Sequence, residues 1–446
     1  MPFSITKYAP IIEQARTSFW FVPSFMVLSS ILLAGLAIYI DAVYIDSIKH
    51  SLPLIYQLDI DAIRSLLATI AGAMITVTSI AFSITIVALT LASSQFGPRL
   101  LRNFMMDSGT QVVLGSFISN FLFCILAFCA ISFQQLYTLK PGIMVVIAVL
   151  MTCFSVGVLI YFIHHVAKSI QADVVIDDVY QELQCGIEQL FPSVNQQHEA
   201  VSNAESIENG LTQRAHQINV LASFSGYIQT VDRKALITLA TDSDVLVECL
   251  YGPGDFVVQN AVIATIYSDN LVDNKVTDLA SIQIVLGAYR TPVQDPEFAI
   301  HQLVEIALRA LSPGINDPYS AITCIDKLTS VLCELTTKVF PEKQHYDQAG
   351  ILRLVCKVLS FKNIAKAAFD QIRQQANSNV AVTIRLLESL QVLMTFVQTN
   401  EQKHFVKSQT KMIEEQQSKQ PLSKDDSSAI NSKVALILNS PVNKSV

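Results

Sequence analysis

Four long stretches of this 446-residue chain contain no Asp, Glu, Lys or Arg. They lie at 19–40, 65–98, 111–139 and 141–163. Because about 20 apolar residues cross a hydrocarbon core of roughly 30 Å, this lack of charge excludes an ordinary soluble amino-terminal half. We expect an amphipathic segment at 1–17 and then a transmembrane α-helical domain at 18–166. Its four helices are predicted at about 19–40, 65–95, 111–137 and 141–164.

Sequence signatures of catalysis and cofactor binding are also missing. The chain has no Walker loop, no GxGxxG, no nucleophile elbow and no HExxH. Its eight cysteines form no CxxC pair, which argues against a zinc site and a disulfide framework, and their scatter suits a reducing compartment. A net charge of −7 gives no indication of nucleic-acid binding. We therefore expect no enzyme, no resident cofactor and no nucleic-acid partner.

No Asp, Glu, Lys or Arg lies inside a predicted span, which argues against the proton relay or coupling-ion site of a pump. No cleavable signal peptide is expected, because the first apolar run begins late and is too long. Lys and Arg are more frequent on one side of the spans, which predicts that both termini are cytoplasmic. The residues on that side are Lys7, Arg16, Arg99, Arg102 and Lys168, against Lys49, Arg64 and Lys140 on the other.

Beyond the fourth span the sequence becomes polar and its periodicity changes. An amphipathic stretch predicts a linking helix at 167–198. Short runs rich in Val, Ile and Thr predict a small β domain at 213–270. Apolar residues that recur with a helical period predict a helical domain at 295–400, with one helix near 347–359. The Ser-, Lys- and Asn-rich segment 416–446 is predicted to be a disordered tail.

The second span carries a hydroxyl or a glycine every three or four residues. On a helix these positions form one stripe about 120° wide or less. The stripe consists of Thr69, Gly72, Thr76, Ser79, Ser83, Ile86, Thr90 and Ser93. Ile86 is the only member that is neither small nor hydroxylated. The opposite side is assigned to a lipid-facing or packing surface made of Ala68, Ile75, Phe82, Leu89 and Phe96.

Two interpretations of the stripe stay open. In the first, small residues let helices approach closely and hydroxyls bond across helices or to their own carbonyls. In the second, the stripe lines a water-filled path at the axis of an oligomer. Ile86 would then form a hydrophobic constriction that gates by dewetting.

The end of the second span offers a hinge and two cations. Gly97 and Pro98 are predicted to break or kink the helix. Arg99 and Arg102 follow at the predicted cytoplasmic boundary. They either reach toward lipid headgroups or form the mouth of a pore.

The stretch "RALSPGINDPYSA" predicts a rigid corner between two helices. Pro313 and Gly314 end the first helix, while Asp317 and Pro318 supply the N-cap and first position of the second. Asn316 and Asp317 are also candidates for contact with a ligand or a neighbouring subunit. Turn chemistry by itself is sufficient to account for these residue types.

Other polar residues are assigned structural or solvent-exposed roles. His164 and His165 mark a membrane boundary, and His301 with Glu305 forms a solvated or packed pair. The acidic face that contains Asp177 is solvated or, alternatively, forms a cation-attracting vestibule.

Several motifs resemble a bacterial family of membrane proteins catalogued as domain of unknown function 2254. They are "SSQFGPRLLRNFM", "SGYIQTVD", "GPGDFVV" and "ALRALSPGINDPYSAITCIDKL". The resemblance spans about residues 10–400 and implies a bacterial inner-membrane protein with four spans and a cytoplasmic carboxy-terminal part. "SGYI" and "GDFVVQNAVIATI" also resemble the barrel-sandwich domains of lipoyl and biotinyl carriers. The attachment lysine is absent from the carrier turn, since Lys234 lies in "VDRKAL", which favours a structural adaptor.

These features favour a homo-oligomeric ion channel or pore in the lipid bilayer, which inorganic ions would cross along the stripe. The cytoplasmic part, a small β domain plus helices, would assemble or gate it. The alternative is a membrane-anchored scaffold or sensor that binds a protein or small ligand and transports nothing.

Overall fold

The computed structural model describes residues 20–43, 59–100, 104, 107–132, 142–191, 214–376 and 379–439. The chain divides into two compact units, Met1–Val175 and Ile176–Val446. The predicted segment 1–17 lies outside the described residues, as does Arg102.

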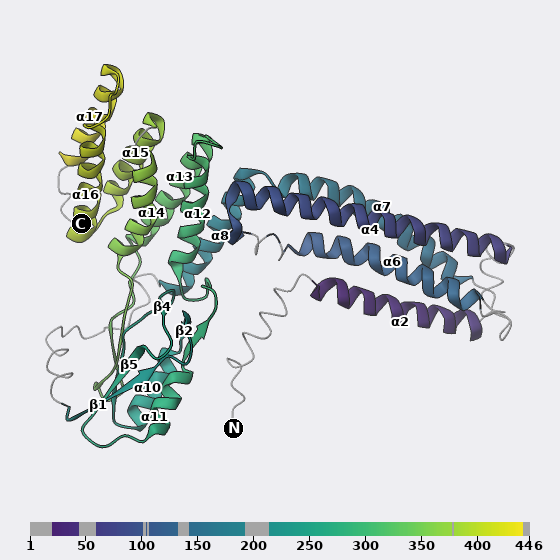
Figure 1. The fold of residues 1–446 in the computed structure, drawn as a ribbon, viewed down its shortest axis with the longest axis horizontal. Helices are drawn as coiled ribbons and strands as arrows, with labels where there is room; N and C mark the ends of the chain where they lie inside the picture. The colour runs from purple at the N-terminus through teal and green to yellow at the C-terminus, as the bar shows by residue number, and fades with distance from the viewer. Residues whose placement is uncertain are drawn as a thin grey trace. The chain divides into compact units, whose positions relative to one another are not determined.

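Among the described residues of the first unit, four helices are long and apolar enough to cross a membrane (Figure 1). They are α2 (Phe21–Val43), α4 (Ile60–Phe96), α6 (Ser108–Ser132) and α7 (Ile143–Ser169). The predicted number of candidate spans is therefore confirmed by helix length and composition. At 1.5 Å per residue, the 37 residues of α4 extend about 55 Å. Because this exceeds a hydrocarbon core of roughly 30 Å, Asp61 and Arg64 belong to the helix without lying at the membrane centre.

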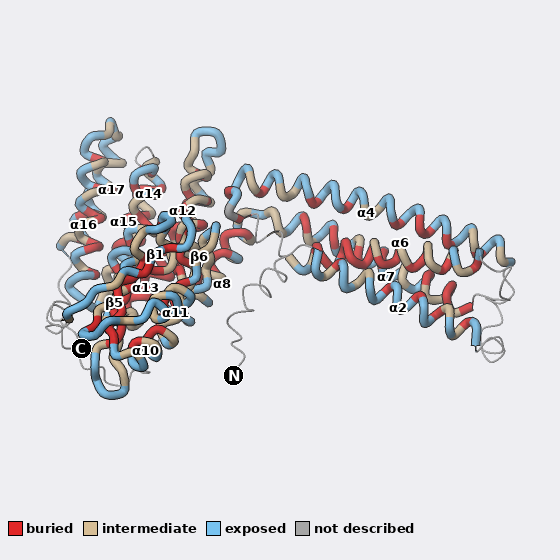
Figure 2. Tube along the Cα trace, turned by 60° about the horizontal axis from the view of Figure 1, so that its bottom comes forward, coloured by how far each residue is buried: buried red, intermediate tan, exposed pale blue. Residues whose placement is uncertain are grey.

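Helix α6 forms the centre of this unit and packs against α2, α4 and α7. Figure 2 shows its buried positions beside the more exposed neighbouring helices. Gly115 permits the closest approach, since a Cβ there would stand 2.6 Å from Sδ of Met26 and 3.1 Å from Cα of Pro23. Phe117 and Phe123, both buried, belong to two separate apolar clusters of this unit.

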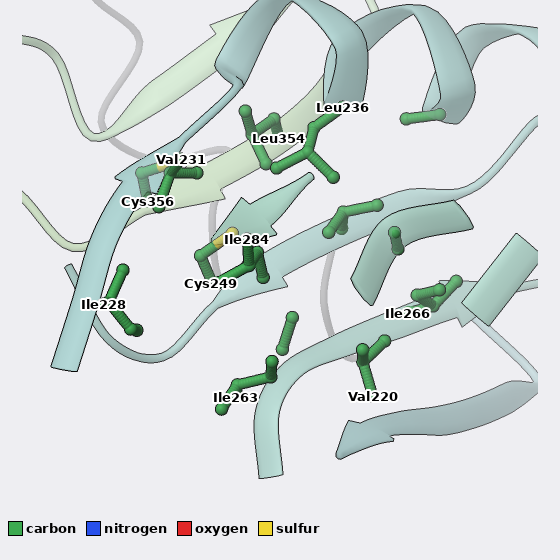
Figure 3. Packing of buried hydrophobic residues seen from close by; sticks show 14 of the residues in the cluster. Val220, Ile228, Val231, Leu236, Cys249, Ile263, Ile266, Ile284, Leu354 and Cys356 are labelled. Carbon is green, nitrogen blue, oxygen red and sulfur yellow. The ribbon is translucent and has the colours of Figure 1, made fainter. Parts of the chain in front are cut away.

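The described residues of the second unit form two small sheets. The five-stranded sheet has the order β1 (His216–Leu221), β5 (Val262–Ser268), β3 (Leu246–Cys249), β8 (Leu352–Cys356), β7 (Gln344–Tyr346). The three-stranded sheet has the order β4 (Phe256–Val257), β2 (Gly226–Val231), β6 (Ile284–Gly287). Helices α10 (Arg233–Asp242) and α11 (Asn274–Ile282) complete this part. Side chains from both sheets and both helices share one apolar core (Figure 3).

The prediction of a helix near 347–359 is wrong, because β7 is followed there by β8. Strand β8 pairs with β3 on one side and β7 on the other, and its last four residues are buried. A strand buried on both faces loses the alternation that identifies strands in a sequence. The barrel-sandwich resemblance stays a prediction, and Lys234 lies within α10.

Seven helices account for most of the second unit's described residues outside the β part. They are α8 (Ala172–Leu190), α12 (Pro296–Ala310), α13 (Pro318–Leu335), α14 (Phe361–Gln375), α15 (Val380–Phe396), α16 (Asn400–Gln417) and α17 (Lys424–Leu438). Tyr180 on α8 hydrogen-bonds Ser330 on α13 at 3.0 Å, and Lys327 Nζ lies 2.7 Å from Asp177 Oδ1. These contacts give Asp177 a partner within the fold.

The segment 416–446, predicted to be a disordered tail, instead contains α17. Ser423 caps the helix by accepting the backbone N–H of Asp426 at 3.1 Å. Ile430, Val434 and Ile437 are buried at helical spacing. The polar composition concealed an apolar stripe, and a helix needs only such a stripe to pack.

Candidate functional site

The predicted stripe lies on the uncovered side of α4. Seven of its eight residues are exposed in the single chain, and Ser93 is half-buried. Ile86 is 47% exposed. The stripe is therefore turned away from α6 and α7, the helices that α4 contacts in its own unit.

The five residues assigned to the opposite side of α4 do not lie opposite the stripe, although the exposure of three of them is compatible with a lipid-facing surface. Of the five residues assigned to it, only Phe96 is buried, while Ala68, Ile75 and Phe82 are exposed and Leu89 is half-buried. The packing face contains Leu67, Met74, Ala81, Thr85 and Ala92 instead. At 100° per residue this set lies opposite the stripe, and the predicted set lies between the two. The packing face of α4 is thus apolar and small, as a close helix–helix seam requires.

The hydroxyls of the stripe bond to their own helix. Thr69, Thr76, Ser79, Ser83 and Thr90 each donate to the backbone carbonyl four residues earlier, at 2.7–3.0 Å. Such bonds satisfy the donor without a partner from another helix. Each oxygen still has lone pairs that water or a neighbouring chain can use.

Gly72 is not required by packing within the chain. Among the described residues, no atom lies within 4 Å of the position that its Cβ would occupy. A glycine in the middle of a helix costs about 0.5–1 kcal/mol relative to alanine, so its use on this open face suits contact from outside the chain.

Helix α4 ends at the predicted position. Gly97 has φ 115°, and Pro98 begins a short 3₁₀ turn to Leu100. The backbone N–H of Gly97 donates to Ser93 O at 3.2 Å, which closes the last turn. A hinge motion at Gly97 and Pro98 stays a prediction, as does the pore-mouth role of Arg99 and Arg102. The side chain of Arg99, like the whole of Arg102, lies outside the described part of the chain.

Sequence reasoning missed a polar cluster inside the helices. Asn120 on α6 is fully buried and donates to Ser155 Oγ at 3.1 Å and to Thr152 Oγ1 at 3.4 Å, both on α7. The signal was a lone Asn in an apolar helix, which requires a partner. The cluster fixes α7 against α6.

Asp41 caps the amino end of α7. The residue is fully buried at the end of α2, where its carboxylate accepts the backbone N–H of Ile143 at 2.9 Å and that of Met144 at 3.1 Å. A carboxylate at the amino end of a helix satisfies orphan donors and interacts favourably with the helix dipole. The first span predicted from the sequence, about 19–40, stops one residue before Asp41.

Replacing Asp41 by alanine is expected to lower the stability of the membrane unit by about 1–2 kcal/mol, the usual cost of a lost cap. The thermal midpoint of the detergent-solubilised protein measures this. Asp61→Ala is the matched control, because Asp61 is exposed and makes only a surface ion pair with Arg64. Equal effects of the two substitutions would show that the cap does not stabilise the unit.

His165 has a partner that helical spacing did not reveal. Its Nε2 lies 2.7 Å from Asp107 Oδ2, and Asp107 also caps α6 through the N–H of Thr110 at 2.9 Å. Burial raises the pKa of Asp107, but the hydrogen bonds from Thr110 and His165 outweigh it and hold the pKa below its usual value. Gly109 leaves room for the pair, since a Cβ there would stand 2.8 Å from His165 Nε2. His165 is thus part of a contact between α6 and α7.

In the second unit, the structure shows the predicted corner. Asn316 has φ 50°, and the Asp317 carboxylate accepts the N–H of Ser320 at 3.2 Å at the start of α13. Asn316 and the neighbouring Ile315 and Tyr319 are exposed. A subunit contact through Asn316 and Asp317 stays a prediction.

His301 of this unit takes part in a structural contact. His301 Nδ1 lies 3.2 Å from Arg290 Nη1, and the Arg290 guanidinium is 2.7 Å from the buried Asp295. No group of three or more His, Cys, Asp or Glu side chains among the described residues is arranged to hold a metal ion.

The family profile described as "Predicted membrane protein (DUF2254)" matches residues 16–392. "Uncharacterized protein Rv1290c" of Mycobacterium tuberculosis (strain ATCC 25618 / H37Rv) is 31% identical over 340 residues, covering 73% of this chain and 63% of its own length. "Uncharacterized protein Mb1321c" of Mycobacterium bovis has the same identity and coverage. This chain thus spans under two thirds of these relatives, and no solved structure matches. The chain belongs to the predicted membrane protein family of domain of unknown function 2254.

Proposed function

We propose that this protein assembles into a homo-oligomer in which the exposed face of α4 lines a pore for inorganic ions. One observation supports the proposal most strongly: the hydroxyl and glycine stripe lies opposite the packing face of α4 and is uncovered in the single chain. An uncovered transmembrane face meets either lipid or another copy. Hydroxyls and Gly72 gain nothing from lipid, whereas water can use the remaining lone pairs of the hydroxyls.

A specific observation favours a second candidate. The back-bonded hydroxyls need no water, so the same face can form a dry seam between copies. In that case the protein is a membrane-anchored scaffold or sensor without transport.

The second unit is assigned to the cytoplasm and to a non-enzymatic role. Both termini and the second unit lie in the cytoplasm of a bacterial cell, as the Lys and Arg distribution favours. The second unit assembles or gates the pore and performs no enzymatic step.

The assembly is tested by cross-linking between copies, after exposed Cys129, Cys153 and Cys185 are replaced by serine. We expect oxidation to join Ser79→Cys chains into dimers in vesicles. Ile160→Cys on the outer side of α7 is the matched control and should remain monomeric.

Recording of ion currents through the purified oligomer in a bilayer then distinguishes a pore from a dry interface between copies. Cross-linked copies without ion flux across applied voltage and tension would favour the scaffold. Equal cross-linking at Ser79→Cys and Ile160→Cys, with the mass of a monomer in detergent, would contradict both forms of the assembly.

A further inference from the structure

Two cysteines far apart in the sequence face each other in the second unit. Strands β3 and β8 are parallel, and Cys249 is the register partner of Cys356. Both side chains are in the same buried core cluster, where Figure 3 labels them, and both are free thiols. Neighbouring strands lie about 4.8 Å apart, and disulfide-bonded cysteines have Cα atoms about 4.4–6.8 Å apart. The backbone therefore already has the spacing that a disulfide needs.

The two thiols differ in acidity. A hydrogen bond from Cys249 is the main cause that lowers the pKa of Cys356 below its usual value, helped by His345 and Arg233 and opposed by burial. The same contact and burial raise the pKa of Cys249. A thiolate is the reactive form of cysteine, so Cys356 is the nucleophile of the pair. Cys324 on α13 is a contrast within the chain, because burial strongly raises its pKa.

The strand that carries the nucleophile lies next to the edge of the sheet. Cys249 and Cys356 are 4% and 3% exposed. Beyond β8 lies β7, an edge strand of three half-buried residues, and Cys356 N–H donates to Lys343 O beside it at 2.8 Å. Short edge strands open more readily than central ones. A reagent close in size to water needs only this local opening.

We propose that Cys249 and Cys356 are a redox-active pair that a small peroxide converts into a reversible disulfide. The Cys356 thiolate attacks one oxygen of hydrogen peroxide, the O–O bond breaks, and the departing hydroxide takes up one proton to leave as water. The Cys249 thiol then attacks the sulfur of the resulting sulfenic acid, which forms the S–S bond and releases a second water. Two thiols and one hydrogen peroxide thus give one disulfide and two waters, and a dithiol reverses the reaction by exchange.

The disulfide would connect two distant parts of the chain. Helices α12 and α13 lie between β3 and β8 in the sequence, so the bond encloses both in a covalent loop. Oxidation would fix the parallel pairing of β3 with β8. This pair does not depend on the proposed pore.

The test uses the full chain in detergent, with Cys129, Cys153 and Cys185 replaced by serine. The protein is treated with hydrogen peroxide, unfolded, alkylated and analysed by intact mass and peptide mapping. We expect two thiols per chain to escape alkylation, a peptide that joins Cys249 to Cys356, and full recovery with dithiothreitol. Cys324→Ser should leave this result unchanged.

Two further variants keep the result interpretable. Cys356→Ser should leave Cys249 reduced, and Cys249→Ala should let dimedone trap a sulfenic acid on Cys356. Full alkylation of Cys249 and Cys356 after peroxide, or a disulfide that joins other cysteines instead, would overturn the proposal. So would equal dimedone labelling of Cys324 and Cys356.

Discussion

Replacing Ile86 by serine is expected to raise ion flux through reconstituted protein by about tenfold or more. In an oligomer, the Ile86 side chains would surround the axis and expel water from a narrow neck. A tenfold change corresponds to a barrier lowered by about 1.4 kcal/mol, less than the roughly 1.5–3 kcal/mol gained when one such side chain leaves water. Ser83 and Thr90 lie one turn away on the stripe, and their hydroxyls already donate to backbone carbonyls of α4. The new serine can do the same, so the fold should remain intact.

Ile84→Ser is the matched control for this experiment. Ile84 is on the same helix two residues away and is 40% exposed, but it lies outside the stripe. Its replacement should leave flux at the wild-type value. Flux through Ile86→Ser that equals wild type, with an unchanged oligomer size, would contradict the gate. An equal rise in both variants would indicate a general leak.

Replacing Ile437 by alanine is expected to destabilise the packing of α17 by about 2–5 kcal/mol, the usual cost of emptying a buried aliphatic site. Ile437 is fully buried, and Val434 and Ile430 precede it on the same face. The backbone amides of α17 should then lose protection from hydrogen exchange in the full-length protein. Nearby Lys433, 2.8 Å from Glu388 on α15, should not compensate, because half-exposed ion pairs contribute little.

The neighbouring residue provides the control. Leu436 is 59% exposed, and Leu436→Ala should change exchange by little. Fast exchange throughout residues 424–438 of the wild-type protein would support the disordered tail that composition alone predicts.

The membrane half could be predicted closely because lack of charge is a strong and local signal. The carboxy-terminal end of α4 and the stripe follow from spacing within one helix, whereas the helix begins at Ile60, five residues before the predicted start. Which face of α4 packs could not be obtained so directly, because small residues such as Ala81 and Ala92 form the seam while large ones such as Phe82 remain exposed. Packing against α6 decides that face, and a single helix does not contain this information.

The contacts between distant residues were beyond sequence reasoning. Asp41 caps α7 across about a hundred residues, and Cys249 meets Cys356 only because β8 returns to the sheet after α12 and α13. Strand β8 itself resembled a helix, since burial on both faces removes alternation. Such pairings depend on topology, and spacing along one segment does not reveal them.

Water access to Ser83→Cys tests most directly whether the exposed face of α4 lines a hydrated path. The variant is placed in vesicles in a background without Cys129, Cys153 and Cys185, and a charged thiol reagent is added from the aqueous side. We predict rapid modification of Ser83→Cys and a fall in ion flux, while Ile160→Cys on α7 reacts only with a lipid-soluble maleimide. Modification of Ser83→Cys by the lipid-soluble reagent alone, with flux unchanged, would contradict a pore along α4.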